Sequence, residues 1–525
     1  MSLRHVLRVI VLAAFLVLPV SCRAQNGAAS PAQSRLGINL SGPADWNSEL
    51  PFVDVFRLSR EWISQREGQA WGKGPALSRD ANGWVTRVEP GCYVETPMCT
   101  IEGGRFPQGQ YVCLYEGEGK LEFWGAVSRV VEAKPGRIVF ETKPGESPIW
   151  LRIREVNPRN YVRNIRVIMP GFEATYQKEP FHPAFLKRWR GFNTLRFMDW
   201  METNDQPLSH WSERPTPSYC NYAERGVPVE VMVDLCNRLG ANAWFCMPHR
   251  ADDDYVREFA SYVKAHLRPG LKAYVEYSNE VWNGGFGQQG YAQKKGQELG
   301  LGPKERPWEG AGMYYARRSV EIFDLWEQVF GGRDRLVRVI AWQAASPFWV
   351  ENIVLPTDEA YKHADALAIA PYMGFMVPAE TNREQIGADQ VQSWTVGQVL
   401  DYTEKTALPE SIKMVQDQKR IADKFGLRLI CYEAGQHLVG IGEATRNERL
   451  TKLFTDANRN PRMGQIYTQY LAAWKANGGD LMCIFASVNA WGRSGSWGLA
   501  EHYDETEADQ PKLKAVMEWN RANPR

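Results

Sequence analysis

Short apolar runs recur along this chain, and amphipathic stretches separate most of them. The runs occupy residues 36–40, 193–198, 241–247, 273–277, 336–341, 366–370, 427–432 and 481–486. Apolar runs of this length without strict alternation are typical of parallel strands that are buried on both faces. The stretch at 227–240 has Pro228 near its start and Gly240 at its end, as expected for an intervening helix. Eight strands with intervening helices predict an α/β fold, a (β/α)8 TIM barrel.

A different pattern fills residues 71–172, where Gly and Pro are frequent and the apolar runs are short and alternating. Runs at 111–115, 121–124, 137–140, 150–154 and 165–169 have the spacing of strands in an antiparallel sandwich. We therefore predict that residues 71–172 form an antiparallel β-sandwich domain, inserted after a first barrel unit at 35–70. Residues 173–525 would then supply the remainder of the barrel.

The N-terminus has the pattern of an export signal, with basic residues before an apolar run at 9–20 that is too short to span a bilayer. A signal peptide at 1–24 would leave a soluble secreted or periplasmic protein with a flexible leader at 25–34. Residues 18–22 also resemble a bacterial lipoprotein box, which would place a lipid on Cys22 and anchor the chain at the bacterial envelope. Both routes stay open, and this lipid is the one membrane contact expected.

Charge and aromatic content narrow the choice of partner. Lys and Arg number 62 and Asp and Glu number 61 in 525 residues, so no overall field attracts nucleic acid or an anionic membrane. The 20 tryptophans exceed what a core needs, and flat aromatic rings with polar rims suit the faces of sugars. A neutral glycan is therefore the expected partner. The sequence indicates no oligomeric state.

The cysteines suggest packing more than chemistry. Cys246, Cys431 and Cys483 lie within apolar runs and are expected to be small buried side chains. Export permits disulfides, and Cys92 with Cys99 or Cys113 is a candidate bridge. No CxxC or HxxxH spacing is present, so neither a metal nor a cofactor is expected.

Chemically coherent side chains follow the predicted strands, at the end of a barrel where catalytic groups gather. Asn279-Glu280 ends the fourth strand and Glu433 ends the seventh. The substrate-binding candidates are Arg196, Trp200, His249, Asn279, Trp282, Trp342, Tyr372 and Trp491. Two carboxylates with a guanidinium, an imidazole and aromatic rings are what hydrolysis of a neutral polyhydroxylated ring needs.

These strand ends resemble clan A of the glycoside hydrolases, the retaining (β/α)8-barrel enzymes. The resemblance rests on Asn279-Glu280, on Glu433 in the segment 429–435, and on strand-end positions such as Arg196 and His249. It implies that Glu280 is the acid/base and Glu433 the nucleophile in the cleavage of β-linked neutral saccharides. Many members of the clan have Pro after Asn-Glu, whereas this chain has Val281. The whole chain also resembles exported bacterial proteins labelled as cellulose-binding domain proteins.

Each candidate has a structural alternative. Arg196 is also a natural ion-pair partner for Asp199 or Glu433. His249 is placed to cap the following helix or to pair with the acidic run at 252–254, which itself suits an exposed first helical turn. Trp282, Trp342 and Trp491 are equally suited to ordinary packing. The alternative function is a catalytically inactive exported carbohydrate-binding or adhesion protein on a barrel scaffold.

Overall fold

A computed structural model describes residues 34–145 and 147–524 of the chain, and it contains a closed barrel of eight parallel strands. In barrel order these are β1 (Leu36–Asn39), β12 (Thr194–Arg196), β13 (Asn242–Met247), β14 (Ala273–Tyr277), β15 (Leu336–Ala341), β16 (Ala366–Ile369), β18 (Arg428–Cys431) and β20 (Met482–Ile484). Each lies within one of the eight predicted runs. The predicted (β/α)8 barrel is therefore confirmed.

The barrel interior is a packed core separate from the layer between strands and helices. Aliphatic and aromatic side chains such as Val339, Ile430 and Trp244 fill it, all of them buried. Close packing explains why position 37 is glycine, because a Cβ there would lie 2.4 Å from Cys483 Sγ. The strands are therefore held at positions that bring their carboxyl ends to one mouth.

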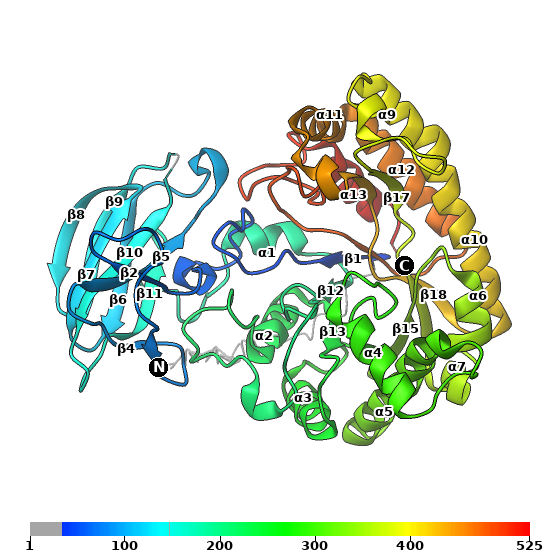
Figure 1. Ribbon diagram of the computed structural model, residues 1–525, viewed down its shortest axis with the longest axis horizontal. Helices are drawn as coiled ribbons and strands as arrows, with labels where there is room; N and C mark the ends of the chain where they lie inside the picture. Colours follow the sequence, from blue (N-terminus) through cyan, green and yellow to red (C-terminus); the bar gives the residue numbers. More distant parts are fainter. Residues whose placement is uncertain (1–33, 146, 525) are drawn as a thin grey trace, which may run out of the picture.

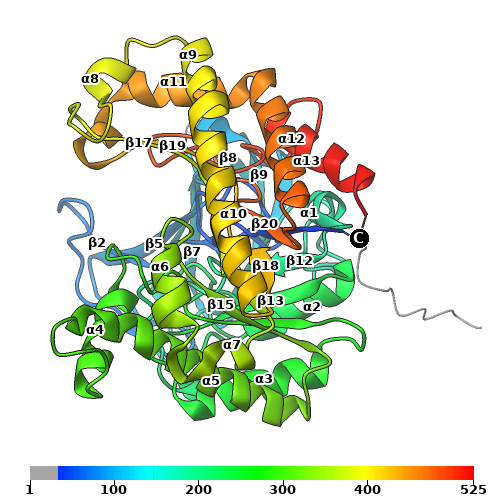
Figure 2. The ribbon, with the colours of Figure 1, turned by 90° about the vertical axis from the view of Figure 1, so that its right-hand side faces the viewer.

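Helices surround the barrel (Figures 1 and 2), with α10 running along the outside of β18. The longer ones are α2 (Val229–Leu239), α3 (Asp253–His266), α4 (Gly287–Glu298), α5 (Gly310–Phe330), α10 (Leu408–Lys424), α11 (Glu448–Arg459), α12 (Pro461–Ala476) and α13 (Pro511–Ala522). Shorter ones are α1 (Pro183–Trp189), α6 (Pro347–Trp349), α7 (Ala360–His363), α8 (Ala388–Val391) and α9 (Val396–Tyr402). Gly240 ends α2 in the left-handed region, at φ 68°, and Asp252 caps α3 by accepting from the amide of Tyr255. Both ends follow the sequence signals.

An antiparallel sandwich lies beside the barrel (Figure 1) and enters the chain between β1 and α1. One sheet contains β2 (Ile63–Arg66), β5 (Cys92–Met98), β10 (Ile149–Val156) and β7 (Gly119–Gly125). The other contains β11 (Arg163–Ile168), β6 (Gln110–Glu116), β9 (Arg137–Thr142) and β8 (Val127–Lys134). A small ribbon pairs β3 (Ser78–Arg79) with β4 (Val85–Arg87). Because β2 pairs with β5, the first sheet starts at residue 63, earlier than the predicted boundary at 71.

The cysteines and the N-terminal segment were also the subject of predictions. All eight cysteines from Cys92 onward are free and buried, so the candidate bridge from Cys92 to Cys99 or Cys113 is wrong. The predicted signal peptide, Cys22 and nearly all of the leader lie outside the described residues. Across residues 34–145 and 147–524, no helix is long and apolar enough to cross a membrane.

Candidate active site

The end of β14 delivers Asn279 and Glu280 into the barrel mouth through a strained turn. Ser278 and Glu280 both have positive φ, at 59° and 43°, which is uncommon for residues with a side chain and typical of functional positions. The amide of Asn279 is oriented on both sides, because Oδ1 accepts from Arg196 at 2.9 Å and Nδ2 donates to Asn204 at 3.1 Å. The turn therefore presents two adjacent side chains with defined directions.

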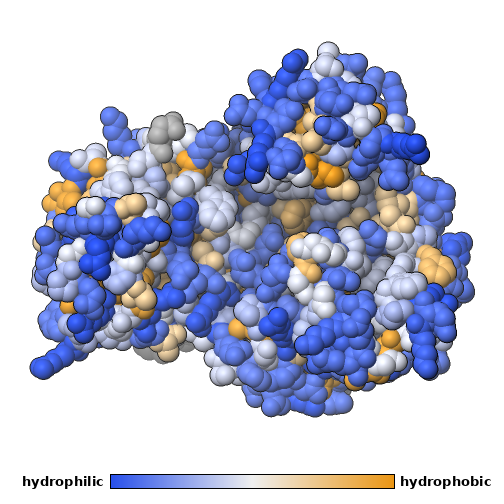
Figure 3. Space-filling view, in the orientation of Figure 1, coloured by the Kyte–Doolittle hydropathy of each residue, from blue (hydrophilic) through white to orange (hydrophobic). Residues whose placement is uncertain are grey.

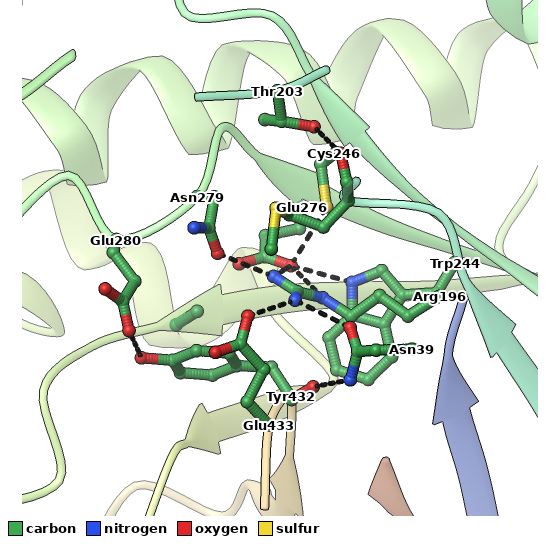
Figure 4. A network of polar contacts seen from close by, with 12 residues as sticks. Asn39, Arg196, Thr203, Trp244, Cys246, Glu276, Asn279, Glu280, Tyr432 and Glu433 are labelled. Carbon is green, nitrogen blue, oxygen red and sulfur yellow. Dashed lines mark hydrogen bonds and ion pairs between the residues drawn. The ribbon is translucent and has the colours of Figure 1, made fainter. Parts of the chain in front are cut away.

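Glu280 sits among hydrogen-bond donors but makes no ion pair with any described residue (Figure 4). Tyr432 donates its phenol hydrogen to Oε1 at 3.0 Å, and Asn283 donates to Oε2 at 2.8 Å. Burial, and after it the negative charge of Glu433, raises the pKa of Glu280 to about 7. A carboxyl with this pKa can hold a proton at neutral pH and give it up during a reaction.

Glu433 follows β18 and has a different environment. It forms an ion pair with Arg196, whose Nη1 lies 2.8 Å from Oε1, and Tyr372 donates to Oε2 at 2.9 Å. The side chain is nearly buried, with 6% of the residue exposed. Both oxygens are thus held in place, and each accepts from a donor that favours a negative charge.

Arg196 is the centre of the network in Figure 4 and is fully buried. Besides Glu433, it donates through Nε and Nη2 to Glu276 at 3.2 and 3.0 Å, and through Nη1 to Asn39 at 3.1 Å. The rings of Trp244 and Tyr432 lie 5.5 and 5.1 Å from its guanidinium carbon. One cation therefore serves two buried carboxylates and orients Asn279 as well.

The two glutamates form an asymmetric pair. Glu433 is paired with a cation, whereas Glu280 has only neutral hydrogen-bond donors and a pKa raised to about 7. Different environments around two nearby carboxyls are how proteins assign acid and base roles. The arrangement can protonate one atom of a ligand while placing a carboxylate beside another.

The structure separates the remaining candidates into three groups. Trp200 and Trp342 are core residues. Trp200 is fully buried among Phe52 and Phe185, and its indole donates to the carbonyl of Ser41. Trp342 packs between the rings of Tyr315 and Trp349. Both rings are buried in this structure, at 0% and 4% exposure, and the substrate contacts of these two tryptophans stay predictions.

His249 and Trp282 each keep an unused polar atom. Nδ1 of His249 and Nε1 of Trp282 are buried without a partner among the described residues. Burial, and then the charge of Arg250, lowers the pKa of His249 to about 4, so its ring is neutral at pH 7. His249 does not cap α3, because Asp252 does so. Both unpaired atoms are buried, so neither is exposed to a ligand in this structure.

Trp491 lies in the loop after β20 and lines a cleft between the barrel mouth and the sandwich. Only 7% of the residue is exposed, and its indole donates to the carbonyl of Gly498. Trp497, farther along the same loop, is more exposed. Its ring centre lies 6.0 Å from that of Tyr372 and 4.6 Å from that of His437. Sequence reasoning missed Trp497, because it is 13 positions beyond the end of β20 (497 − 484).

Other contributors were also missed. Asn39 ends β1 and has the same strand-end position as the predicted site residues. Tyr432 directly precedes Glu433 and reaches back to Glu280. The strands β17 (Met373–Val377) and β19 (Gln436–Gly440) pair in parallel beside the mouth, next to Tyr372 and Glu433. Their pairing holds the two segments that carry Tyr372 and Glu433 together.

The cleft has a volume of about 810 Å³, within the roughly 300–1,000 Å³ typical of ligand sites. Figure 3 shows the molecule hollowed between the sandwich on the left and the barrel on the right. The cleft is lined by loops after β1, β12 and β20 and by residues 60–61 and 100–102, which connect to the sandwich. No group of three or more potential metal ligands occurs within residues 34–145 and 147–524.

Comparisons with family models and with curated proteins find no match to this chain. Solved structures with a similar fold include the CBM22-1 and GH10 modules of Clostridium thermocellum endo-1,4-β-D-xylanase 10B, complexed with xylohexaose. That match has 10% identity, a TM-score of 0.34, and covers 90% of this chain and 96% of the other. Xylanase 10C of Cellvibrio japonicus, in complex with xylopentaose, matches with 9% identity, a TM-score of 0.37, and coverage of 87% and 96%. The β-glycosidase of Thermosphaera aggregans matches with 12% identity, a TM-score of 0.34, and coverage of 68% and 86%. With TM-scores below 0.5, these likenesses do not extend to the details of a site.

Proposed function

We propose that the protein is a retaining glycoside hydrolase that cleaves β-linked neutral poly- or oligosaccharides, with Glu280 as acid/base and Glu433 as nucleophile. The asymmetric environment of the two glutamates carries this proposal. A glycosidic oxygen is a poor leaving group, so it needs a proton from one carboxyl while a second carboxylate attacks the anomeric carbon. Glu280 and Glu433 have the environments that these two roles require.

In the first step, Glu433 attacks the anomeric carbon, the bond to the glycosidic oxygen breaks, and Glu280 gives its proton to that oxygen. The product is a sugar ester of Glu433. In the second step, Glu280 takes a proton from water, the resulting hydroxide attacks the anomeric carbon, and Glu433 leaves as a carboxylate. Retention requires carboxyls roughly 5–5.5 Å apart, and the effect of the Glu433 charge on the pKa of Glu280 is in line with close neighbours.

The surrounding residues support the same chemistry. Asn279 has one Nδ2 hydrogen bonded to Asn204 and a second one free for a sugar hydroxyl. Tyr372 and Arg196 hold Glu433 in a single orientation, which places the nucleophile before the substrate binds. The resemblance to clan A assigns the same roles to Glu280 and Glu433. Export, as the N-terminal sequence predicts, would bring the enzyme to its glycan outside the cytoplasm.

The test is hydrolysis of a panel of β-glucans, xylans and mannans by the purified chain, with release of reducing sugar as the readout. We expect Glu280→Ala and Glu433→Ala to abolish turnover while the native circular-dichroism spectrum is retained. Glu433→Ala should also lower the melting temperature, because buried Arg196 loses one of its two carboxylates. The exposed Glu443 provides a matched control, and Glu443→Ala should keep wild-type activity. Azide should restore cleavage in Glu433→Gly with an inverted product. Full activity in either glutamate variant would refute the assignment. Glycan binding without any hydrolysis would favour the inactive binding protein.

A further inference from the structure

An exposed tryptophan lies in the cleft between barrel and sandwich, and the proposed reaction of Glu280 and Glu433 does not use it. Trp46 follows β1, lines the cleft, and has 60% of its surface exposed. The guanidinium carbon of Arg60 lies 5.8 Å from its ring centre. A large aromatic ring this exposed in a cleft is an unused binding surface, because burying it would be favourable.

The position of Trp46 is set by a polar cluster that joins the two domains. Arg60 donates to both oxygens of Asp45, at 3.0 and 2.8 Å, and Thr100 donates to Asp45 from its hydroxyl at 2.5 Å. The Asp45 side chain is buried, at 1% exposure. Arg60 and Thr100 flank strands of the sandwich, whereas Asp45 belongs to the loop after β1. The sandwich therefore backs the indole through Arg60 and leaves ring surface open to the cleft.

Neither glutamate lines the cleft, but the strand order places it nearer to Glu433, which follows β18 next to β20, than to Glu280. Asp199 lines the cleft, and burial, followed by the charges of Glu433 and Glu202, raises its pKa to about 7. Loops after the adjacent strands β20, β1 and β12 form this side of the mouth, whereas Glu280 follows β14, two strands beyond β12. The acid stands beside the leaving group, so a cleft on the other side faces the sugars that stay with the nucleophile.

We propose that this cleft binds the sugar residues on the non-reducing side of the scissile bond, with Trp46 as their stacking platform and the sandwich domain as one wall. This inference rests on the proposed function for the direction of the sugar chain. It assigns the inserted domain a part in the active site. It also makes Trp46 a specificity-determining residue for substrates longer than one sugar on that side.

The charges of the cleft suit an uncharged chain. The carboxyls of Asp199 and Glu202 have no hydrogen-bond or ion-pair partner within the described part of the chain, and burial raises the pKa of Glu202 to about 7 as well. These groups can exchange hydrogen bonds with sugar hydroxyls. A uronic acid beside Asp199 and Glu202 would bring a further negative charge to them, which like-charge repulsion disfavours, whereas Arg60 and Arg493 line other parts of the cleft. Neutral sugars are therefore the expected occupants of the part of the cleft beside the two carboxyls.

The first experiment uses aryl β-glycosides with one, two and three sugars of the kind that the enzyme cleaves best. Lengthening these substrates adds sugars only on the non-reducing side, so kcat/KM should rise with length. We expect Trp46→Ala to reduce the ratio of kcat/KM for the three-sugar and one-sugar substrates by about tenfold, the equivalent of about 1.4 kcal/mol. Trp71→Ala is the matched control, because Trp71 is 57% exposed on the sandwich but lies outside the cleft. It should leave the ratio unchanged.

The second experiment measures binding without turnover. Cello-, xylo- and manno-oligosaccharides of two to six units are titrated into the full chain carrying Glu433→Ala, with and without Trp46→Ala. Affinity that grows with length and falls about tenfold with Trp46→Ala supports the subsite, even if the wild-type chain hydrolyses nothing and the proposed function fails. The proposal is overturned if no oligosaccharide binds, or if Trp46→Ala changes neither the kcat/KM ratio nor the affinity while hydrolysis proceeds.

Discussion

The phenol hydroxyl of Tyr432 should lower the pKa of Glu280, the proposed proton donor. Removing this hydroxyl therefore tests the assignment of Glu280 as the acid, because it predicts the direction in which the pKa moves. Tyr432 donates to Glu280 at 3.0 Å, and this hydrogen bond favours the ionised carboxylate. In Tyr432→Phe the ring remains beside Arg196 but the donor is lost. The pKa of Glu280 should therefore rise, because the ionised form loses more stabilisation than the protonated form does.

The size of the shift follows from hydrogen-bond energetics. A hydrogen bond stabilises a charged partner by a net free energy of about 1.5–3 kcal/mol and a neutral partner by about 0.5–1.5 kcal/mol. The difference, about 1–1.5 kcal/mol, corresponds to about 0.7–1 pKa unit. In the proposed mechanism the reaction requires protonated Glu280, so kcat/KM should fall above a pH of about 7. In Tyr432→Phe this alkaline limb should move up by about 0.7–1 unit.

The assay is kcat/KM against pH on an unactivated oligosaccharide, whose leaving oxygen needs the proton. A dinitrophenyl glycoside needs no such proton, so its alkaline limb should be weak in both proteins. Tyr470→Phe is the matched control, because Tyr470 is a buried tyrosine whose hydroxyl donates to the carbonyl of Pro371. An alkaline limb that stays in place or moves down in Tyr432→Phe would refute the reasoning. So would an equal shift in Tyr470→Phe.

Two further predictions concern stability. Arg196→Met leaves Glu276 and Glu433 buried without their cation, so the free energy of unfolding, measured with urea at pH 7, should fall by about 3–5 kcal/mol. An unchanged urea midpoint would contradict the central role of Arg196. Glu49 is buried, and burial raises its pKa from 4.5 to about 7, so the native state keeps a proton that the unfolded state has lost between these values. The free energy of unfolding should therefore fall as pH rises from about 4.5 to about 7. Glu49→Gln should make this fall smaller by about 3 kcal/mol, because 2.5 pKa units (7 − 4.5) at 1.36 kcal/mol each correspond to that amount. Equal slopes of unfolding free energy against pH in the two proteins would contradict this prediction.

The barrel strands, and the positions of Glu280 and Glu433 at strand ends, could be predicted from the sequence because both leave local signals. A strand buried on both faces is a short apolar run, and its carboxyl end marks the barrel mouth without knowledge of any contact. Glu280 and Glu433 follow such runs directly, and so does Asn279. The sandwich was also visible as a change in run length and turn content.

Only the tertiary structure decided which side chains near those ends are open to a ligand. Trp200 follows β12 closely, yet Phe52 and Phe185 from other segments cover it. Trp46 had no strand-end signal, and it is open because the Asp45–Arg60 pair joins two domains around a cleft. The pKa of Glu280 likewise depends on burial and on Glu433, which lies 153 positions away (433 − 280). Local sequence reports which residues form buried strands, whereas exposure and charge at a site depend on contacts between distant segments.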